Sequence, residues 1–201
     1  MTDEKRPYRM TARAELQEDT RRRITESAVA LHGSLGPAKT SMSAVAEHAG
    51  VRRSTLYRHF PDEAALFVAC SSHWAMQHPM PDPTSWAAID DPDKRLRRAL
   101  TELYDYYQGG EDMLANLFRD FDVVDVVREH FAPFQSYLSA ARDVLLAGRG
   151  RVPRRTRAAI GHAITFATWR SLTREQGLPQ RETVALMCEL VASSAHPVDA
   201  R

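Results

Sequence analysis

The chain has 201 residues, of which 43% are hydrophobic and 26% charged, a composition typical of a soluble globular protein that buries a core. No apolar run approaches the roughly 18 residues that a membrane span needs, and the polar residues 1–10 contain no signal-peptide core. The two cysteines, Cys70 and Cys188, exclude a disulfide framework and have no metal-ligand spacing. We therefore expect a cytoplasmic protein with no metal and no cofactor.

The charge is distributed unevenly along the chain, although the net charge is only +1. Residues 1–60 contain 11 Lys and Arg against 7 Asp and Glu, whereas residues 61–201 contain 16 against 19. The first part is therefore net positive and the second net negative. This asymmetry is expected if only the first part of the chain faces phosphates.

Apolar residues recur at helical spacing through nearly the whole chain, and alternating strand patterns are missing, so we predict an all-α fold. Residues 1–14 are polar and basic, and we predict a disordered tail there. A helix is expected from about Leu16 to His32, and the segment GSLGPAK at 33–39 ends it.

Two short helices separated by a glycine are predicted next. Ser41 is a suitable N-cap for the first helix, Gly50 ends it, and the second helix is expected at about 52–59. Ala46 is placed where the two helices would approach, and Gly50 can adopt the left-handed conformation that reverses the chain. Braced by the preceding helix, this arrangement is typical of a helix-turn-helix.

The second short helix has an outer face made of hydrogen-bond donors. Val51, Leu56 and Phe60 are expected to face inward, and no acidic residue interrupts the outer face. Surface helices normally mix charges of both signs, so this face favours contact with phosphates and base edges over a merely solvated charged surface. With the capping serine, the candidate DNA-binding residues are Ser41, Arg52, Arg53, Ser54, Thr55, Tyr57, Arg58 and His59.

The segment SMSAVAEHAGVRRSTLYRHFPDEAAL at 41–66 resembles the DNA-binding segment of TetR-family transcriptional regulators. The preceding RRRITESAVALHGSLG resembles the first helix of that family, so the resemblance covers about residues 20–66. The positions that match the family pattern in the helix-turn-helix are Ser41, Val45, Ala46, Ala49, Gly50, Val51, Thr55, Leu56, Tyr57, His59 and Phe60.

The resemblance implies a homodimer that binds a palindromic operator, with a C-terminal domain that senses a small molecule and releases the DNA. It implies a three-helix helix-turn-helix domain at 15–62 and a helical effector and dimerisation domain at 63–201. It also implies contacts to phosphates or base edges for Thr55, Tyr57 and His59, with Arg53 and Ser54 placed for base readout.

Three residues depart from the family pattern. Arg52 replaces the usual serine cap of the recognition helix, so a cap is lost and a cation is gained beside the DNA. Glu63 replaces a common lysine, which would weaken a phosphate contact at the start of the fourth helix. His32 stands where an aromatic core residue is common, which predicts looser packing behind the motif.

The rest of the chain is predicted to form helices at 64–78, 92–109, 111–147 with a break near Pro133, 154–176 and 180–195. The last two carry apolar residues on two sides, as a helix does when it packs on its own core and on a second partner. A four-helix interface with a second copy would satisfy this pattern, and a fully buried helix is the alternative. The candidate dimer residues are Ile160, Ile164, Ala167, Val184, Met187 and Val191.

Aromatic residues are concentrated in the middle helices. Aromatics at helical spacing are common in simple cores, but a cluster of this size also suits a cavity for an apolar or aromatic effector. The candidate ligand-binding residues are Tyr104, Tyr107, Phe118, Phe121, Phe134, Tyr137, His162, Phe166 and Trp169.

Together with these patterns, the resemblance to TetR-family regulators implies a dimeric repressor that an effector releases from a palindromic operator. A regulator without an effector, whose C-terminal domain only dimerises or recruits a protein, is the alternative, and an all-helical enzyme is a remote one. No phosphate loop, nucleophile elbow or HExxH motif occurs, so we expect no enzymatic activity. The acidic stretch of Asp120, Asp122, Asp125 and Glu129 beside His130 is predicted to be a solvated face and not a metal cluster.

Overall fold

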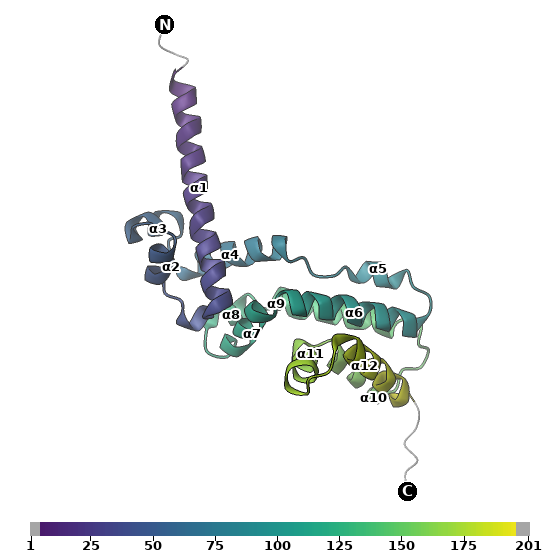
Figure 1. Cartoon of the computed structure of the whole chain (residues 1–201). Helices are drawn as coiled ribbons and strands as arrows, with labels where there is room; N and C mark the ends of the chain where they lie inside the picture. The colour runs from purple at the N-terminus through teal and green to yellow at the C-terminus, as the bar shows by residue number, and fades with distance from the viewer. Residues whose placement is uncertain (1–4, 196–201) are drawn as a thin grey trace. The chain divides into compact units, whose positions relative to one another are not determined.

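The structure is a computed structural model that describes residues 5–195, with side chains from residue 14 onward (Figure 1). The described residues form helices and no strands, so the predicted all-α fold is confirmed. None of the described helices is long and apolar enough to cross a membrane. The chain forms two compact units. Unit 1 comprises the described chain up to Gln77 together with Asp112–His130, and unit 2 comprises His78–Glu111 and the described residues from Phe131 onward.

Unit 1 contains the predicted helix-turn-helix and a segment from much later in the chain. In it the long α1 packs against α4 and α2, α2 packs against α3, and α4 contacts α8 (Figure 1). Its elements are α1(Lys5–Ser34), η1(Pro37–Lys39), α2(Met42–His48), α3(Arg53–His59), α4(Glu63–Gln77), α7(Glu111–Asp120) and α8(Asp125–Glu129).

The core of unit 1 follows the predicted apolar spacing. It joins the inner face of α1 to the inner faces of the three helices that follow, and Leu56 and Phe60 of the second short helix are fully buried in it. The buried residues of this core are Ile24, Ala28, Met42, Val45, Ala46, Leu56, Phe60, Leu66 and Cys70.

Unit 2 is built around α6, which packs against α12, α9, α5 and α11. Its buried Arg95 ties the start of α6 to the end of α9, because its guanidinium donates to the carbonyl oxygens of Ile89, Val144 and Ala147 at 2.7–3.0 Å. The elements of unit 2 are α5(Pro83–Ala87), α6(Pro92–Gly109), α9(Ala132–Leu146), α10(Arg154–Ala163), α11(Phe166–Arg170), the π-helical turn η2(Ser171–Glu175) and α12(Gln180–Ser194).

Several element boundaries differ from the sequence-based prediction. Helix α1 begins at Lys5 and therefore covers most of the predicted disordered tail, while residues 1–4 of that tail lie outside the described residues. The expected connection after α4 contains α5, since the Asp82 side chain accepts from Thr84 N–H and Pro83 starts the helix. The two compact units also divide the chain differently from the predicted boundary at residue 62, because α4, α7 and α8 lie with the helix-turn-helix.

Two predicted long helices are interrupted. The helix expected at 111–147 is three helices, with an unpredicted turn after Asp120 and the predicted break near Pro133, which lies in the first turn of α9. The helix expected at 154–176 breaks at Ile164, and Thr165 starts α11 by accepting from Thr168 N–H at 3.3 Å. A capping side chain accounts for the start of α11, whereas α8 and α9 begin after Val124 and Phe131 without a side-chain cap.

Candidate nucleic-acid interface

The turn between α2 and α3 has the geometry that its residues predict. The Ser41 Oγ accepts a hydrogen bond from Ala44 N–H at 3.1 Å and so caps α2. Gly50 has φ +64°, in the left-handed region, and the following Val51 N–H donates to the Ala46 carbonyl at 2.9 Å. Ala46 is buried at this closure, so a larger side chain there would separate the two helices.

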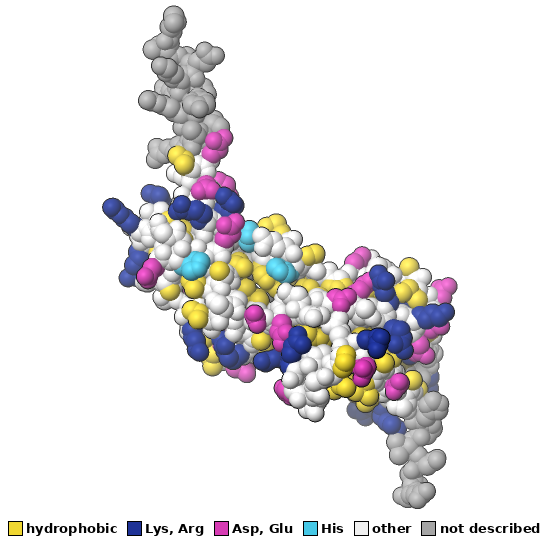
Figure 2. Space-filling view, viewed as in Figure 1, with side chains coloured by type: hydrophobic (Ala, Val, Ile, Leu, Met, Phe, Trp, Pro, Cys, Tyr) yellow, Lys and Arg dark blue, Asp and Glu magenta, His cyan; other side chains and the backbone are white. Residues whose placement is uncertain are grey.

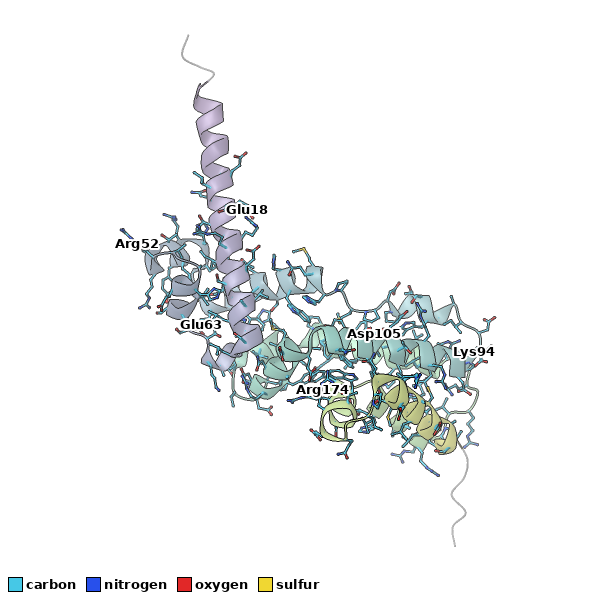
Figure 3. All side chains as sticks on the ribbon, in the orientation of Figure 1. Glu18, Arg52, Glu63, Lys94, Asp105 and Arg174 are labelled. Carbon is cyan, nitrogen blue, oxygen red and sulfur yellow. The ribbon has the colours of Figure 1, made fainter. Side chains whose placement is uncertain are left out.

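Helix α3 presents basic and polar side chains outward along its length. Arg52, at its start, has an N-cap backbone conformation but makes no capping hydrogen bond, as the loss of the usual serine predicts (Figure 3). Tyr57 is 41% exposed although it is a large aromatic residue. Lysine and arginine side chains gather where α3 lies (Figure 2). The exposed members of the predicted set on this helix are Arg52, Arg53, Ser54, Tyr57 and Arg58, and Thr55 and His59 are half-buried.

Arg53 and Tyr57 form a stacked pair one helical turn apart on this outer face. The guanidinium carbon of Arg53 lies 5.9 Å from the centroid of the Tyr57 ring. A guanidinium held over an aromatic ring loses less conformational freedom when it binds a base edge or phosphate than a free one does. The Tyr57 ring therefore orients the Arg53 guanidinium as a hydrogen-bond donor on the exposed face of α3.

His59 differs from its neighbours because its Nε2 atom is buried and has no hydrogen-bond partner. Burial lowers the pKa of the ring, and the nearby positive charges of Arg58 and Arg21 lower it further, against a smaller opposing effect of Glu18. A neutral, partly inward ring is a weaker phosphate ligand than the exposed arginines around it. Sequence spacing alone did not reveal this inward orientation.

A polar clasp from α7 fixes the connection between α1 and α2, and sequence analysis missed it. The Asn116 amide donates to the His32 and Gly33 carbonyls at 3.0 and 2.7 Å, which caps the end of α1. Arg119 donates to the Leu35 carbonyl at 2.9 Å and to both carboxylate oxygens of Asp120.

Asp120 completes the clasp by accepting from Ala38 N–H at 2.9 Å. The prediction of a solvated face is therefore wrong for Asp120, which is only 2% exposed, whereas Asp122, Asp125 and Glu129 are exposed. The Arg119 guanidinium and the Ala38 N–H hold the pKa of Asp120 below its usual value, although burial alone would raise it.

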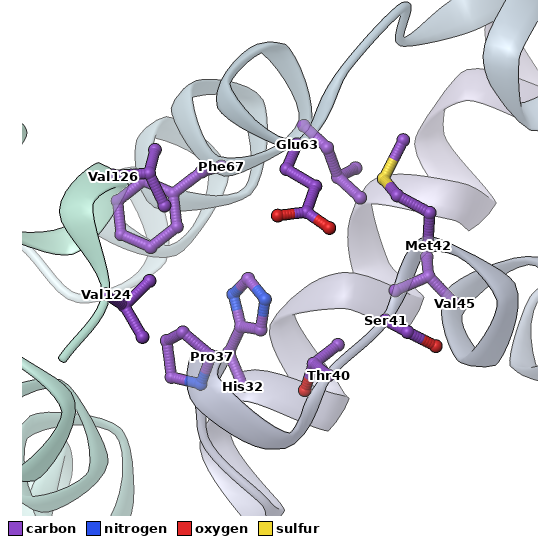
Figure 4. Close-up of a pocket in the computed structure, with 11 residues that line it drawn as sticks. His32, Pro37, Thr40, Ser41, Met42, Val45, Glu63, Phe67, Val124 and Val126 are labelled. Atoms are coloured by element: carbon purple, nitrogen blue, oxygen red, sulfur yellow. The ribbon is translucent and has the colours of Figure 1, made fainter.

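His32 lies behind the helix-turn-helix beside a small cavity of about 40 Å³ (Figure 4). The Glu63 carboxylate points into this cavity from the start of α4 (Figure 4). The His32 ring is 8% exposed, stacks at 5.8 Å on Phe67 and lies 3.5 Å from the Cys70 sulfur. Burial lowers the pKa of His32 to about 4, with a smaller opposing effect of Asp120, so the ring is neutral at physiological pH. The cavity agrees with the predicted looser packing at this position.

The sequence profile of the family "Bacterial regulatory proteins, tetR family" matches residues 24–70, which span α1 to α4. This match shows that residues 24–70 are similar to the DNA-binding segment of TetR-family regulators. The match supports a DNA-binding role for this segment.

Solved structures of TetR-family proteins share the fold along the chain. NalD, the secondary repressor of the MexAB-OprM multidrug efflux pump in Pseudomonas aeruginosa, is 21% identical, with 90% of this chain and 97% of that chain covered and a TM-score of 0.60. A TetR-family transcriptional regulator from Streptomyces coelicolor is 20% identical, with coverages of 88% and 79% and a TM-score of 0.59. A TetR-like transcriptional regulator from Rhodococcus sp. RHA1 is 18% identical, with coverages of 86% and 93% and a TM-score of 0.61. No curated protein matches the sequence.

The predicted ligand-binding residues are divided between the two compact units. Phe118 and Phe121 belong to unit 1, and the others belong to unit 2. In unit 2 the rings of Tyr107, Phe166 and Trp169 pack against one another at centroid distances of 5.5–6.1 Å. These three rings form a packed core.

Three tyrosine hydroxyls of unit 2 donate hydrogen bonds to backbone carbonyls. Tyr104 and Tyr107 donate to the Ala163 and Ile164 carbonyls at 2.8 and 2.6 Å, at the break between α10 and α11, and Tyr137 donates to the Pro81 carbonyl at 2.8 Å. The hydroxyls thus satisfy carbonyl groups that the interrupted backbone leaves outside helical hydrogen bonding. Of the remaining predicted residues, Phe134 lies on α9, and the exposed His162 lies at the end of α10 within 3.2 Å of the Thr168 hydroxyl.

The face predicted for the dimer contact requires a correction. Five of the six candidates are buried in the core of unit 2, namely Ile160, Ile164, Val184, Met187 and Val191, so they cannot also cover a second copy. Ala167 alone is exposed. The opposite stripe of α12 is the accessible one, since Leu186 and Leu190 are 38% and 43% exposed. Both stripes have helical spacing, and only the tertiary fold decides which of them faces the core.

Proposed function

We propose that this protein is a homodimeric repressor that reads a palindromic operator with α3 and leaves it when an apolar or aromatic effector binds unit 2. The observation that carries the proposal is the outer face of α3, where exposed donors and three arginines lie without an acidic neighbour. Such a face suits phosphates and the acceptor-rich major groove. NalD, which has the same fold, is a repressor, and this supports the same direction of regulation.

Within this proposal the residues of α3 divide by function. Arg52 and Arg58 lie toward the two ends of the helix and bind phosphates, which sets the register of the helix in the groove. Arg53, oriented by Tyr57, reads a guanine through its O6 and N7 atoms, the commonest specific contact of an arginine. Ser41 contributes from the start of α2, where its hydroxyl already binds the backbone.

The proposed dimer uses the exposed stripe of α12. Leu186 and Leu190 are apolar and accessible, and α10 packs beside α12 within unit 2. Two copies that bring these helices together form a four-helix contact with twofold symmetry. Two recognition helices then reach half-sites about 34 Å apart, one turn of DNA.

The effector is proposed to bind among the aromatic residues of unit 2, at the break after Ala163. Irregular backbone surrounds this cluster, because α10 ends there and the π-helical turn η2 follows α11. π-Helical turns are frequent at functional sites. The tight packing of Tyr107, Phe166 and Trp169 favours the second candidate function, a regulator without an effector, since an effector would have to separate these rings.

Selection of bound sequences from a random duplex pool tests the proposal. The expected result is a palindrome with half-sites about one helical turn apart, bound by two copies of the chain. Enrichment of a single, asymmetric half-site would contradict the dimer, and enrichment of no sequence would contradict operator binding. A screen of aromatic and aliphatic compounds for release of the selected duplex then distinguishes an effector-controlled repressor from a regulator without an effector.

A further inference from the structure

Arg21 connects α1 to the end of the recognition helix. Its Nη1 donates to the carbonyl oxygen of His59, the last residue of α3, at 2.8 Å. Its guanidinium carbon also lies 4.2 Å from the centroid of the Phe60 ring. Arg21 is half-buried, although it belongs to a run of three consecutive arginines that cannot be told apart by sequence alone.

The contact falls where α3 needs support. The helix has seven residues, its N-terminus lacks a side-chain cap, and Leu56 is its single buried residue. The last carbonyls of a helix have no partner within the helix and carry the negative end of its dipole, so a guanidinium there is favourable. Phe60, the C-cap residue that follows α3, is fully buried, and the Arg21 guanidinium covers its ring.

The neighbouring arginines are placed differently. Arg22 is exposed and pairs with Asp19 at 2.5 Å and Glu26 at 3.5 Å along α1. Arg23 is exposed as well. Arg21, in contrast, contacts the C-terminal end of α3 with both the planar face and an N–H of its guanidinium.

We propose that Arg21 is a positioning residue for DNA readout, which holds the C-terminal end of α3 against α1 and does not itself bind a phosphate. The proposal rests on the proposed operator binding by α3. It adds that the tilt of α3, and with it the ability of the exposed face to distinguish bases, depends on a side chain of α1. Lysine cannot replace Arg21, because an ammonium group has neither a planar face for Phe60 nor a fixed fork of donors.

The test compares Arg21→Met and Arg21→Lys with two controls of equal charge loss, Arg23→Met on α1 and Arg58→Met on α3. Binding to the selected operator and to an unrelated duplex is measured over a range of salt concentrations. We expect Arg21→Met to bind the operator about 10- to 100-fold more weakly, the range for loss of a hydrogen bond to a charged group. Its binding to unrelated DNA and its salt dependence should match those of Arg23→Met.

Salt dependence separates positioning from phosphate binding. Loss of one phosphate contact lowers the slope of log affinity against log salt by about 0.9, which is expected for Arg58→Met. The same fall in slope for Arg21→Met, with equal weakening on both duplexes, would overturn the proposal. Operator binding by Arg21→Met equal to that of Arg23→Met would overturn it too, and so would full activity of Arg21→Lys.

Hydrogen exchange provides a readout without DNA. We expect Arg21→Met to speed exchange at the amides of residues 56–60, with α4 unchanged, and NMR titration should show a raised pKa of His59 because one nearby positive charge is gone. Faster exchange throughout unit 1 would instead assign Arg21 a general structural role and overturn the proposal. If the wild-type chain selects no operator, the proposed function fails, whereas normal wild-type binding with an unaffected Arg21→Met rejects the positioning role alone.

Discussion

Replacing His32 by phenylalanine should remove a specific acid sensitivity of the fold. The pKa of His32 is lowered from 6.5 to about 4, first by burial, so the folded chain binds this proton only at a pH where the unfolded chain is already protonated. The stability linked to His32 is therefore fully present above pH 6.5 and is lost as the pH falls toward 4. The loss amounts to about 3 kcal/mol over that interval and about 2 kcal/mol by pH 5.

The assay is urea unfolding of wild type and His32→Phe at pH 7.5, 6 and 5. Phenylalanine keeps the stacking on Phe67 and enlarges into the small adjacent cavity, so the two proteins should differ by less than about 1 kcal/mol at pH 7.5. At pH 5 the variant should be more stable by about 2 kcal/mol. His48 is exposed on α2, and His48→Phe is measured alongside as the control for an added phenylalanine. Parallel pH profiles of wild type and His32→Phe would refute the reasoning.

Three further predictions concern the clasp and the dimer. Asp120→Asn removes the charged acceptor of Ala38 N–H and Arg119, and should lower the free energy of unfolding by about 1–3 kcal/mol in urea titrations, a result that unchanged midpoints would exclude. Gly36→Ala should destabilise unit 1 by a similar amount, because Gly36 has φ +93° and an added Cβ would lie 2.0 Å from the Arg119 guanidinium. An unchanged free energy of unfolding in the same titration would contradict this close approach of Arg119 to Gly36. If the chain forms the proposed dimer, Leu186→Glu should yield monomers in analytical ultracentrifugation, whereas Met76→Glu, at an exposed apolar site on α4, should leave the dimer intact. Equal behaviour of the two variants would contradict the proposed interface.

The helix-turn-helix could be predicted from the sequence because its determinants are local. The Ser41 cap, the left-handed Gly50 and the inward pair Leu56 and Phe60 each act within a few residues, and the structure confirms all of them. Helix α6 was equally predictable, with Pro92 at its start and Gly109 at its end. These signals depend on neighbouring residues and not on the rest of the fold.

The later part of the chain was less predictable because distant residues decide its environment. Asp120 resembles a surface acid in sequence, yet α7 places it against Ala38, 82 positions away. The two apolar stripes of α12 have the same helical spacing, and packing against α6 buries that of Val184 while exposing that of Leu186. The tyrosines suggested a cavity, but Tyr104 and Tyr107 instead satisfy carbonyls at a helix break that periodicity could not reveal.

The most direct test of the account is operator binding by a chain that lacks both Arg53 and Tyr57, because the central claim is that the outer face of α3 reads DNA. Fluorescence anisotropy should show that Arg53→Ala with Tyr57→Ala weakens binding to the selected operator by about 100-fold or more, as expected when a base contact and its stacked partner are lost. His48→Ala, on the exposed side of α2, serves as the matched control and should bind nearly as wild type does. Operator binding that survives the double substitution unchanged would contradict the claim and place the DNA-reading surface on another part of the molecule.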